Sequence, residues 1–138
     1  MDEHLLILLK IVISILCGYL IGKERKRHDK SAGSRTMSLI CLGACVVSIM
    51  SLKISINHSC NFMRLMAYTI AGISFIGNGV IIKKRNNVDG LTTSATLLVS
   101  VILGFCIGLG YYFLSLVSIT SIYLILESKY WILKKRKA

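Results

Sequence analysis

The residues best suited to chemistry are charged side chains at the ends of long apolar runs. Arg25 and Arg35 flank a short basic loop, where both guanidinium groups could bind an anion or a lipid headgroup at a membrane surface. An ion pair between Glu24 and Arg35 would instead lock two helix ends together. Anchoring of both arginines at the membrane surface accounts for the same pattern without any binding. The sequence leaves these interpretations open.

A second polar group consists of Asn78, Thr92 and Thr93, which lie in or beside two later apolar runs. Amide, hydroxyl and carbonyl oxygens suit hard cations such as Mg²⁺. However, Mg²⁺ sites generally use carboxylates, and every Asp and Glu falls outside the predicted membrane spans. We therefore predict that Asn78 faces protein and hydrogen-bonds to a neighbouring helix, with a cation path as the alternative.

Other activities receive no support from the sequence. There is no nucleophile–base pair, phosphate-binding loop or zinc-type spacing, so no enzyme, metal site or cofactor is predicted. The five cysteines are interpreted as small packing residues, and His4, His28 and His58 are spread over loops and termini and predict no site. The formal net charge is +11, but the basic residues fall between apolar runs, which is typical of membrane-protein loops rather than nucleic-acid binding.

The elements that must position these residues are helices that cross a lipid bilayer. Of 138 residues, 54% are hydrophobic, and the charges are clustered. A bilayer core of about 30 Å requires roughly 17 to 25 helical residues, so the charge-free stretch 90–126 must fold back, near the glycines and tyrosines of 108–112. We predict an all-α membrane bundle of five transmembrane helices, at 5–22, 36–52, 65–82, 91–107 and 111–126.

The basic residues predict the orientation of this bundle. Fourteen Lys and Arg residues fall in the loops 23–35 and 83–90 and in the tail, whereas the two remaining loops contain two. The positive-inside rule then places the amino terminus outside and the carboxyl terminus in the cytoplasm. Residues 1–128 form one membrane domain in this interpretation, followed by a basic cytoplasmic tail at 129–138. Lys10 lies near the outer end of the first span, where its long side chain can reach the interface.

Pairs of glycines recur at spacings that bring both members to one helix face. These pairs are Gly18 with Gly22, Gly72 with Gly79, and Gly104 with Gly108. The first and the last pair are G-x-x-x-G patterns, and the members of the other are seven residues apart. Such faces let helix backbones approach closely, within the bundle or between copies of the chain. Close packing is the preferred interpretation, and a thin helix wall lining a substrate path is the alternative.

Two motifs resemble the MgtC/SapB family of bacterial membrane proteins. The first is G-Y-L-I-G-K-E-R at 18–25, with A-G-S-R-T at 32–36. The second is A-G-I-S-F-I-G-N-G-V-I at 71–81, with V-D-G-L-T-T-S-A at 88–95. The functional positions that the motifs contain are Gly18, Gly22, Glu24, Arg25, Gly33, Arg35, Thr36, Gly72, Gly77, Asn78, Gly79, Gly90, Thr92 and Thr93. Asn78 stands where alanine is usual in the family.

The resemblance implies a multi-pass protein of the plasma membrane, in a short form without the carboxyl-terminal cytoplasmic domain of larger members. Family members are associated with adaptation to low magnesium and, in some pathogens, with survival inside host cells. Some look like regulators of other membrane proteins. The function implied is therefore regulation or stress adaptation through binding to another membrane protein. The alternative is a transporter or channel subunit for a cation such as Mg²⁺.

Overall fold

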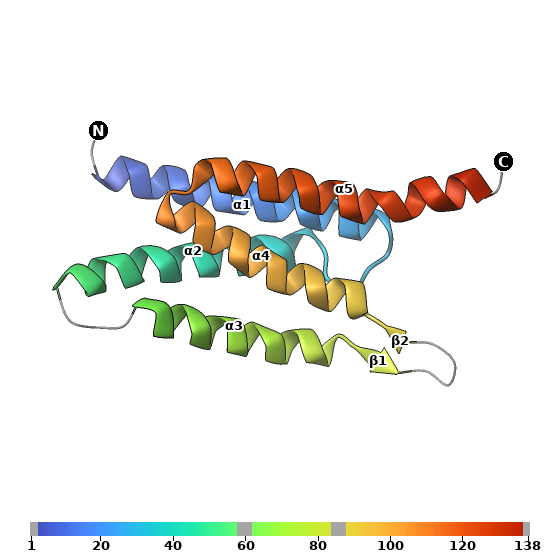
Figure 1. The fold of residues 1–138 in the computed structure, drawn as a ribbon, viewed down its shortest axis with the longest axis horizontal. Coiled ribbons are helices and arrows are strands. Elements are labelled where there is room, and N and C mark those ends of the chain that lie inside the picture. The colour runs from blue at the N-terminus through green and yellow to red at the C-terminus, as the bar shows by residue number, and fades with distance from the viewer. Residues whose placement is uncertain (1–2, 58–61, 84–87, 137–138) are drawn as a thin grey trace.

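The computed structural model describes residues 3–57, 62–83 and 88–136 of the chain. Within these residues it contains five α-helices and one short β-hairpin (Figure 1). In chain order the helices are α1 (Glu3–Arg27), α2 (Ser34–Asn57), α3 (Phe62–Gly79), α4 (Leu91–Leu109) and α5 (Tyr112–Arg136). Each helix overlaps the corresponding predicted span, so the predicted all-α architecture is confirmed.

Three of the described helices are long and apolar enough to cross a membrane, namely α1, α2 over Ser34–Ile54, and α4. The apolar part of α5, Tyr112–Ser128, is shorter, and α3 carries Arg64 and Asn78 near its two ends. Five complete spans stay a prediction. Helix α5 continues to Arg136, so it includes most of the segment predicted as a basic tail.

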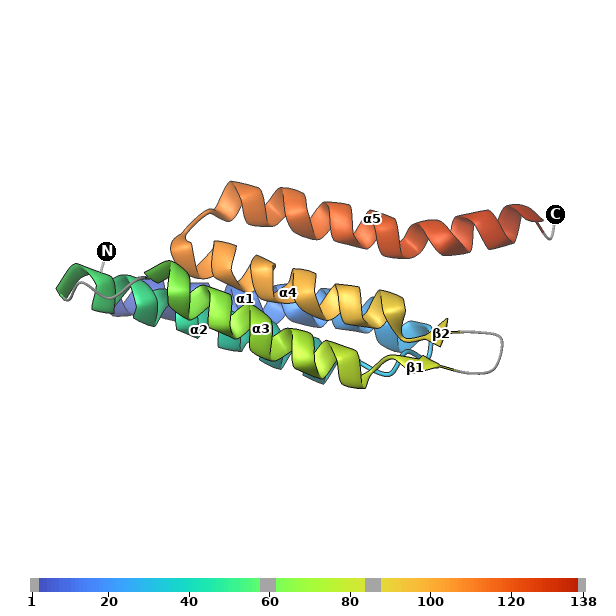
Figure 2. The same cartoon turned by 60° about the horizontal axis from the view of Figure 1, so that its bottom comes forward.

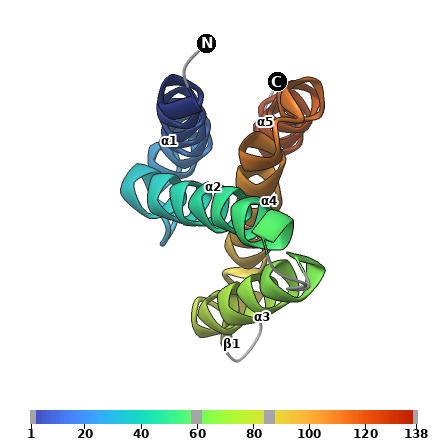
Figure 3. The same ribbon diagram turned by 90° about the vertical axis from the view of Figure 1, so that its left-hand side faces the viewer.

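The helices are arranged around a central pair, α2 and α4 (Figure 3). Helices α1 and α5 lie on one side of this pair, and α3 lies on the other. The core contains small and medium apolar side chains from the three most closely packed helices, including Ile21 of α1, Met37 and Cys41 of α2, and Leu97 and Ile107 of α4. Exposed apolar side chains cover the outer surfaces of α3 and α5, as expected of helices that face lipid.

Glycines bring the central helices into backbone contact. A methyl group added at Gly18 would lie 2.6 Å from the carbonyl oxygen of Met37 and 2.7 Å from the Cα of Ser38. One added at Gly104 would meet the Cys41 carbonyl oxygen and, at 2.8 Å, the Cβ of Ala44. The preferred interpretation of these glycine patterns, close helix packing, is therefore confirmed for α1 on α2 and for α4 on α2.

Two short strands in the connection between α3 and α4 pair as an antiparallel β-hairpin. Strand β1 (Ile82–Lys83) pairs with β2 (Val88–Asp89), with Ile82 opposite Asp89. The predicted third helix continued to residue 82, but α3 ends at Gly79. The reason is local: the glycines around Asn78 disfavour further helix, and Val80 and Ile81 close a turn by donating to the carbonyls of Gly77 and Asn78.

The opposite end of the bundle confirms the predicted reversal within 90–126. Gly110 follows α4 with a φ of +89°, a conformation that favours glycine, and its N–H donates to Ile107. Lys10, predicted to reach the interface, donates to the Gly108 carbonyl in the last turn of α4 at 2.8 Å. An ammonium group at the carboxyl end of α4 also complements the helix dipole.

Successive helices run in opposite directions, so the two chain ends lie at opposite ends of the bundle (Figure 1). The charge distribution predicts that the end holding the β-hairpin faces the cytoplasm. A reporter active only in the cytoplasm should be active when fused after Lys137 and inactive when inserted between α2 and α3. Activity at both positions would contradict the five-span topology.

Candidate functional site

A polar cavity of about 390 Å³ lies at the hairpin end of the bundle, where α1 ends, α4 begins and α5 passes beside them. Its lining includes Arg25 and Lys30 from the end of α1 and the following loop, together with Asp89 of β2. The residues from α4 and α5 are Leu91, Thr92, Thr93, Ile125 and Leu126. Two basic groups against one acid give this cavity the character of an anion site rather than a cation site.

A buried hydrogen bond joins the two predicted motifs inside this site. An Nη atom of Arg25 donates to Oγ1 of Thr93 at 2.7 Å, although the residues are 68 positions apart. Only 4% of Arg25 and 2% of Thr93 is exposed to solvent. A short, charge-assisted bond in such surroundings is strong and directional, so it fixes the end of α1 against the first turn of α4.

Gly90 makes this arrangement possible. It stands between β2 and α4 with a φ of +92°, which favours glycine over other residues. A Cβ at this position would collide with the Val80 carbonyl oxygen. Gly90 therefore lets the hairpin pass close to the end of α3 and turn directly into the helix that carries Thr93.

The structure does not bring every predicted residue into the site. Arg35 and Thr36 are exposed in the first turn of α2, and Gly72 and Gly79 are exposed on α3. Gly22 packs against Ser34, Gly77 packs against Ser94, and Gly33 is half-buried beside Lys26. The motif positions thus divide into those that line the cavity, those that close helix contacts and those on the surface.

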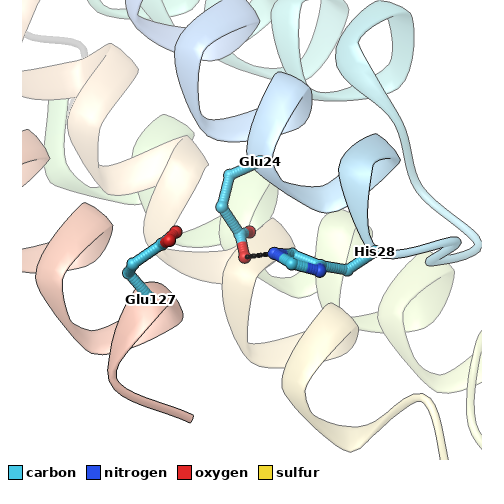
Figure 4. A group of neighbouring side chains, drawn as sticks. All are labelled: Glu24, His28 and Glu127. Atoms are coloured by element: carbon cyan, nitrogen blue, oxygen red, sulfur yellow. Dashed lines mark ion pairs between the residues drawn. The ribbon is translucent and has the colours of Figure 1, made fainter. Parts of the chain in front are cut away.

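One interpretation that the sequence left open, and one prediction, do not hold in the structure. Glu24 does not pair with Arg35; among the described residues its ionic contact is with His28, and Arg35 is exposed. The direction of α1 explains this, since Glu24 points toward α5 rather than toward the start of α2 (Figure 4). Asn78 is exposed rather than turned toward protein, because it occupies the last turn of α3 and not the middle of a span.

A cluster of three side chains lies beside the cavity and was not predicted. Glu24, His28 and Glu127 bring their ligand-type atoms within 4.8 Å of one another (Figure 4). Glu24 and His28 are one helical turn apart, but Glu127 is about a hundred residues away in the sequence. The i, i+4 spacing was visible in the sequence; the third member depends on how α5 packs on α1.

The comparisons with known proteins identify the family. The chain matches the MgtC family over residues 11–135. The chain belongs to the MgtC family. Protein SapB of Bacillus subtilis is 35% identical over 136 residues, covering 94% of this chain and 59% of SapB. Protein MgtC of Salmonella typhimurium is 38% identical over 113 residues, covering 80% of this chain and 48% of MgtC.

An uncharacterized protein of Haemophilus influenzae is similar to the same extent, with 36% identity over 119 residues, 80% of this chain and 50% of that protein. The chain spans about half the length of the curated relatives it matches. No solved structure matches it. The resemblance to the MgtC/SapB family, based on two motifs, is thus confirmed over most of the chain. The MgtC family is not a known family of enzymes.

Proposed function

We propose that this member of the MgtC family is a regulatory protein of the plasma membrane that acts by binding another membrane protein during adaptation to low magnesium. The family membership supports the link to magnesium. The observation that carries the mode of action is the closed packing of α1, α2 and α4. A transporter needs a path between the two membrane faces, and this packing leaves little room for one.

Two cavities lie at opposite ends of the bundle. The larger one borders the hairpin, and one of about 190 Å³ lies near Glu3, Lys10 and Lys53. Between these ends, Gly18 and Gly104 bring α1 and α4 into contact with the backbone of α2. This contact supports a compact bundle without a wide channel.

The buried hydroxyl groups along the core also argue against an ion path. Ser14 and Ser48 donate to carbonyl groups of the preceding turn, both at 2.8 Å. Thr96 and Ser100 of α4 do the same, at 2.6 and 2.8 Å. These hydroxyls are already hydrogen-bonded within their own helices, so they are not arranged as a row of cation ligands. The guanidinium group of Arg25 at the inner end would also repel a cation.

Helix α3 offers a surface for a partner. Gly72 and Gly79 are exposed, and a Cβ at either position would meet no atom within 4 Å. A flat glycine face surrounded by exposed Tyr68, Phe75 and Ile76 suits close contact with a helix of another membrane protein. Association of two copies of the chain through this same face would form a homo-oligomer.

The test is co-purification from a mild detergent. Wild type should retain a membrane protein in stoichiometric amount, and Gly72→Leu or Gly79→Leu should reduce its yield at least tenfold. Gly43→Leu is the matched control, because Gly43 is equally exposed on α2 and has no atom within 4 Å of its Cβ position. The absence of a retained partner, together with saturable Mg²⁺ flux in liposomes, would favour the transporter instead.

A further inference from the structure

The cluster of Glu24, His28 and Glu127 has no role in the proposed partner binding. Glu24 and His28 come from the end of α1, and Glu127 comes from α5, which lies at the outside of the bundle (Figure 2) and contacts α1. The side chains converge from the two helices toward one point (Figure 4). Two carboxylates and an imidazole on different elements form a mixed set of oxygen and nitrogen donors.

The burial of Glu24 leaves one of its carboxylate oxygens without a hydrogen bond in the described part of the chain. Its side chain is only 2% exposed, and its Oε2 atom has no hydrogen-bond partner among the described residues. The Oε2 atom of Glu127 is buried and lacks a hydrogen bond in the same way. A carboxylate removed from water without compensation is strongly destabilising, so the fully buried Glu24, with the partly buried Glu127 beside it, favours a bound cation.

Two ion-pair contacts at these carboxylates are long. The Nε2 atom of His28 lies 3.6 Å from Oε1 of Glu24, which is longer than a good hydrogen bond. The Arg27 guanidinium lies 3.9 Å from Oε1 of Glu127, and the Arg27 side chain is 70% exposed. Both contacts are loose, and Arg27 can turn toward solvent without disturbing the fold.

The spacing of the donors suits a metal ion. Ligand atoms around a tetrahedral ion at about 2.1 Å lie roughly 3.4 Å from one another. The separation of 3.6 Å between Glu24 and His28 is close to this value, and all three donors lie within 4.8 Å. Small rotations of side chains would bring them to one centre.

We propose that Glu24, His28 and Glu127 form a binding site for a divalent transition-metal ion of the Zn²⁺ class. The imidazole decides the class, because Mg²⁺ and Ca²⁺ are bound by oxygen ligands whereas Zn²⁺ readily takes nitrogen and carboxylate together. Three protein ligands leave one coordination position for water or for a group of a partner. The ion would tie α5, at Glu127, to the end of α1.

The binding test uses the full chain in detergent micelles and Zn²⁺ as the probe, measured by calorimetry. We expect one ion per chain, and at least tenfold weaker binding in Glu24→Gln, His28→Ala and Glu127→Gln. Glu3→Gln and His4→Ala are matched controls, since they alter the same two residue types at the other end of α1. Unchanged binding in the three cluster variants would overturn the proposal.

Two further readouts report where the ion binds and which class of ion the site takes. Bound Co²⁺ should show no thiolate-to-metal charge-transfer absorption, and a hundredfold excess of Mg²⁺ should not displace Zn²⁺. Thiolate absorption would show that the ion is bound by cysteines. Displacement by Mg²⁺ would show that the site does not select ions of the Zn²⁺ class. Either result overturns the proposal.

The last readout distinguishes ion binding from a purely structural role. Zn²⁺ should raise the unfolding temperature of wild type but not that of Glu127→Gln. Without metal, Glu24→Gln should be at least as stable as wild type, because it removes an uncompensated buried charge. Folded wild type that shows neither Zn²⁺ binding nor a shift in unfolding temperature would contradict the site.

Discussion

Replacing Gly18 by leucine is expected to destabilise the bundle by about 3 kcal/mol or more. The physical reason is that a Cβ at this position lies 2.6 Å from the Met37 carbonyl oxygen and 2.7 Å from the Cα of Ser38. These are backbone atoms of α2, so no side-chain rotation can relieve the collision. Helices α1 and α2 must separate, and the packing between them is lost.

The measurement is the unfolding temperature in detergent, followed by circular dichroism, together with the fraction of protein that elutes as a single species. Gly43→Leu provides the control, because it adds the same side chain to an apolar helix where no atom lies within 4 Å of the new Cβ. We expect that control to stay within about 0.5 kcal/mol of wild type. Equal stability of the two variants would mean that α1 and α2 do not touch at Gly18.

The sequence was sufficient to predict the helices, because their positions follow from hydrocarbon thickness and the rise per residue. The clearest case is the stretch 90–126, where length alone required a reversal and the structure places it at Gly110. The family also followed from local patterns, since each motif occupies consecutive residues. Gly18 and Gly104 were identified as packing residues by the same local spacing.

The candidate site was only partly predictable, because it depends on which helix faces which. Arg25 and Thr93 were both selected from the sequence, but their hydrogen bond depends on packing between α1 and α4. The ion pair considered between Glu24 and Arg35 is replaced by a contact with His28 for the same reason. His28 was dismissed, since a single histidine near a loop carries no signal until Glu127 arrives from another helix.

Asn78 shows how a boundary error becomes a functional error. The prediction extended the third helix to residue 82 and thereby placed Asn78 deep in hydrocarbon, where an amide must find a protein partner. The helix ends at Gly79, so Asn78 lies in its last turn and is exposed. A shift of three residues at one helix end removed the main argument for a polar path through the bundle.

Removing the hydroxyl group of Thr93 is the second change with a large expected effect. Thr93→Val keeps the shape of the side chain but deprives the buried Arg25 guanidinium of an acceptor at 2.7 Å. Hydrogen bonds to charged groups contribute about 1.5–3 kcal/mol, so we expect a loss of about 2 kcal/mol in the free energy of unfolding. Arg25→Leu should cost at least as much, because it also leaves the Thr93 hydroxyl without its donor.

The double variant decides whether these losses have one origin. If the bond between Arg25 and Thr93 holds α1 against α4, combining Arg25→Leu with Thr93→Val should cost at least about 1 kcal/mol less than the sum of the two single changes. Lys26→Ala is the control, since Lys26 is exposed on the same turn of α1 and its loss should change stability little. Strict additivity would show that the two residues act separately. In that case the cavity at the hairpin end would not be held by the contact that joins the two family motifs.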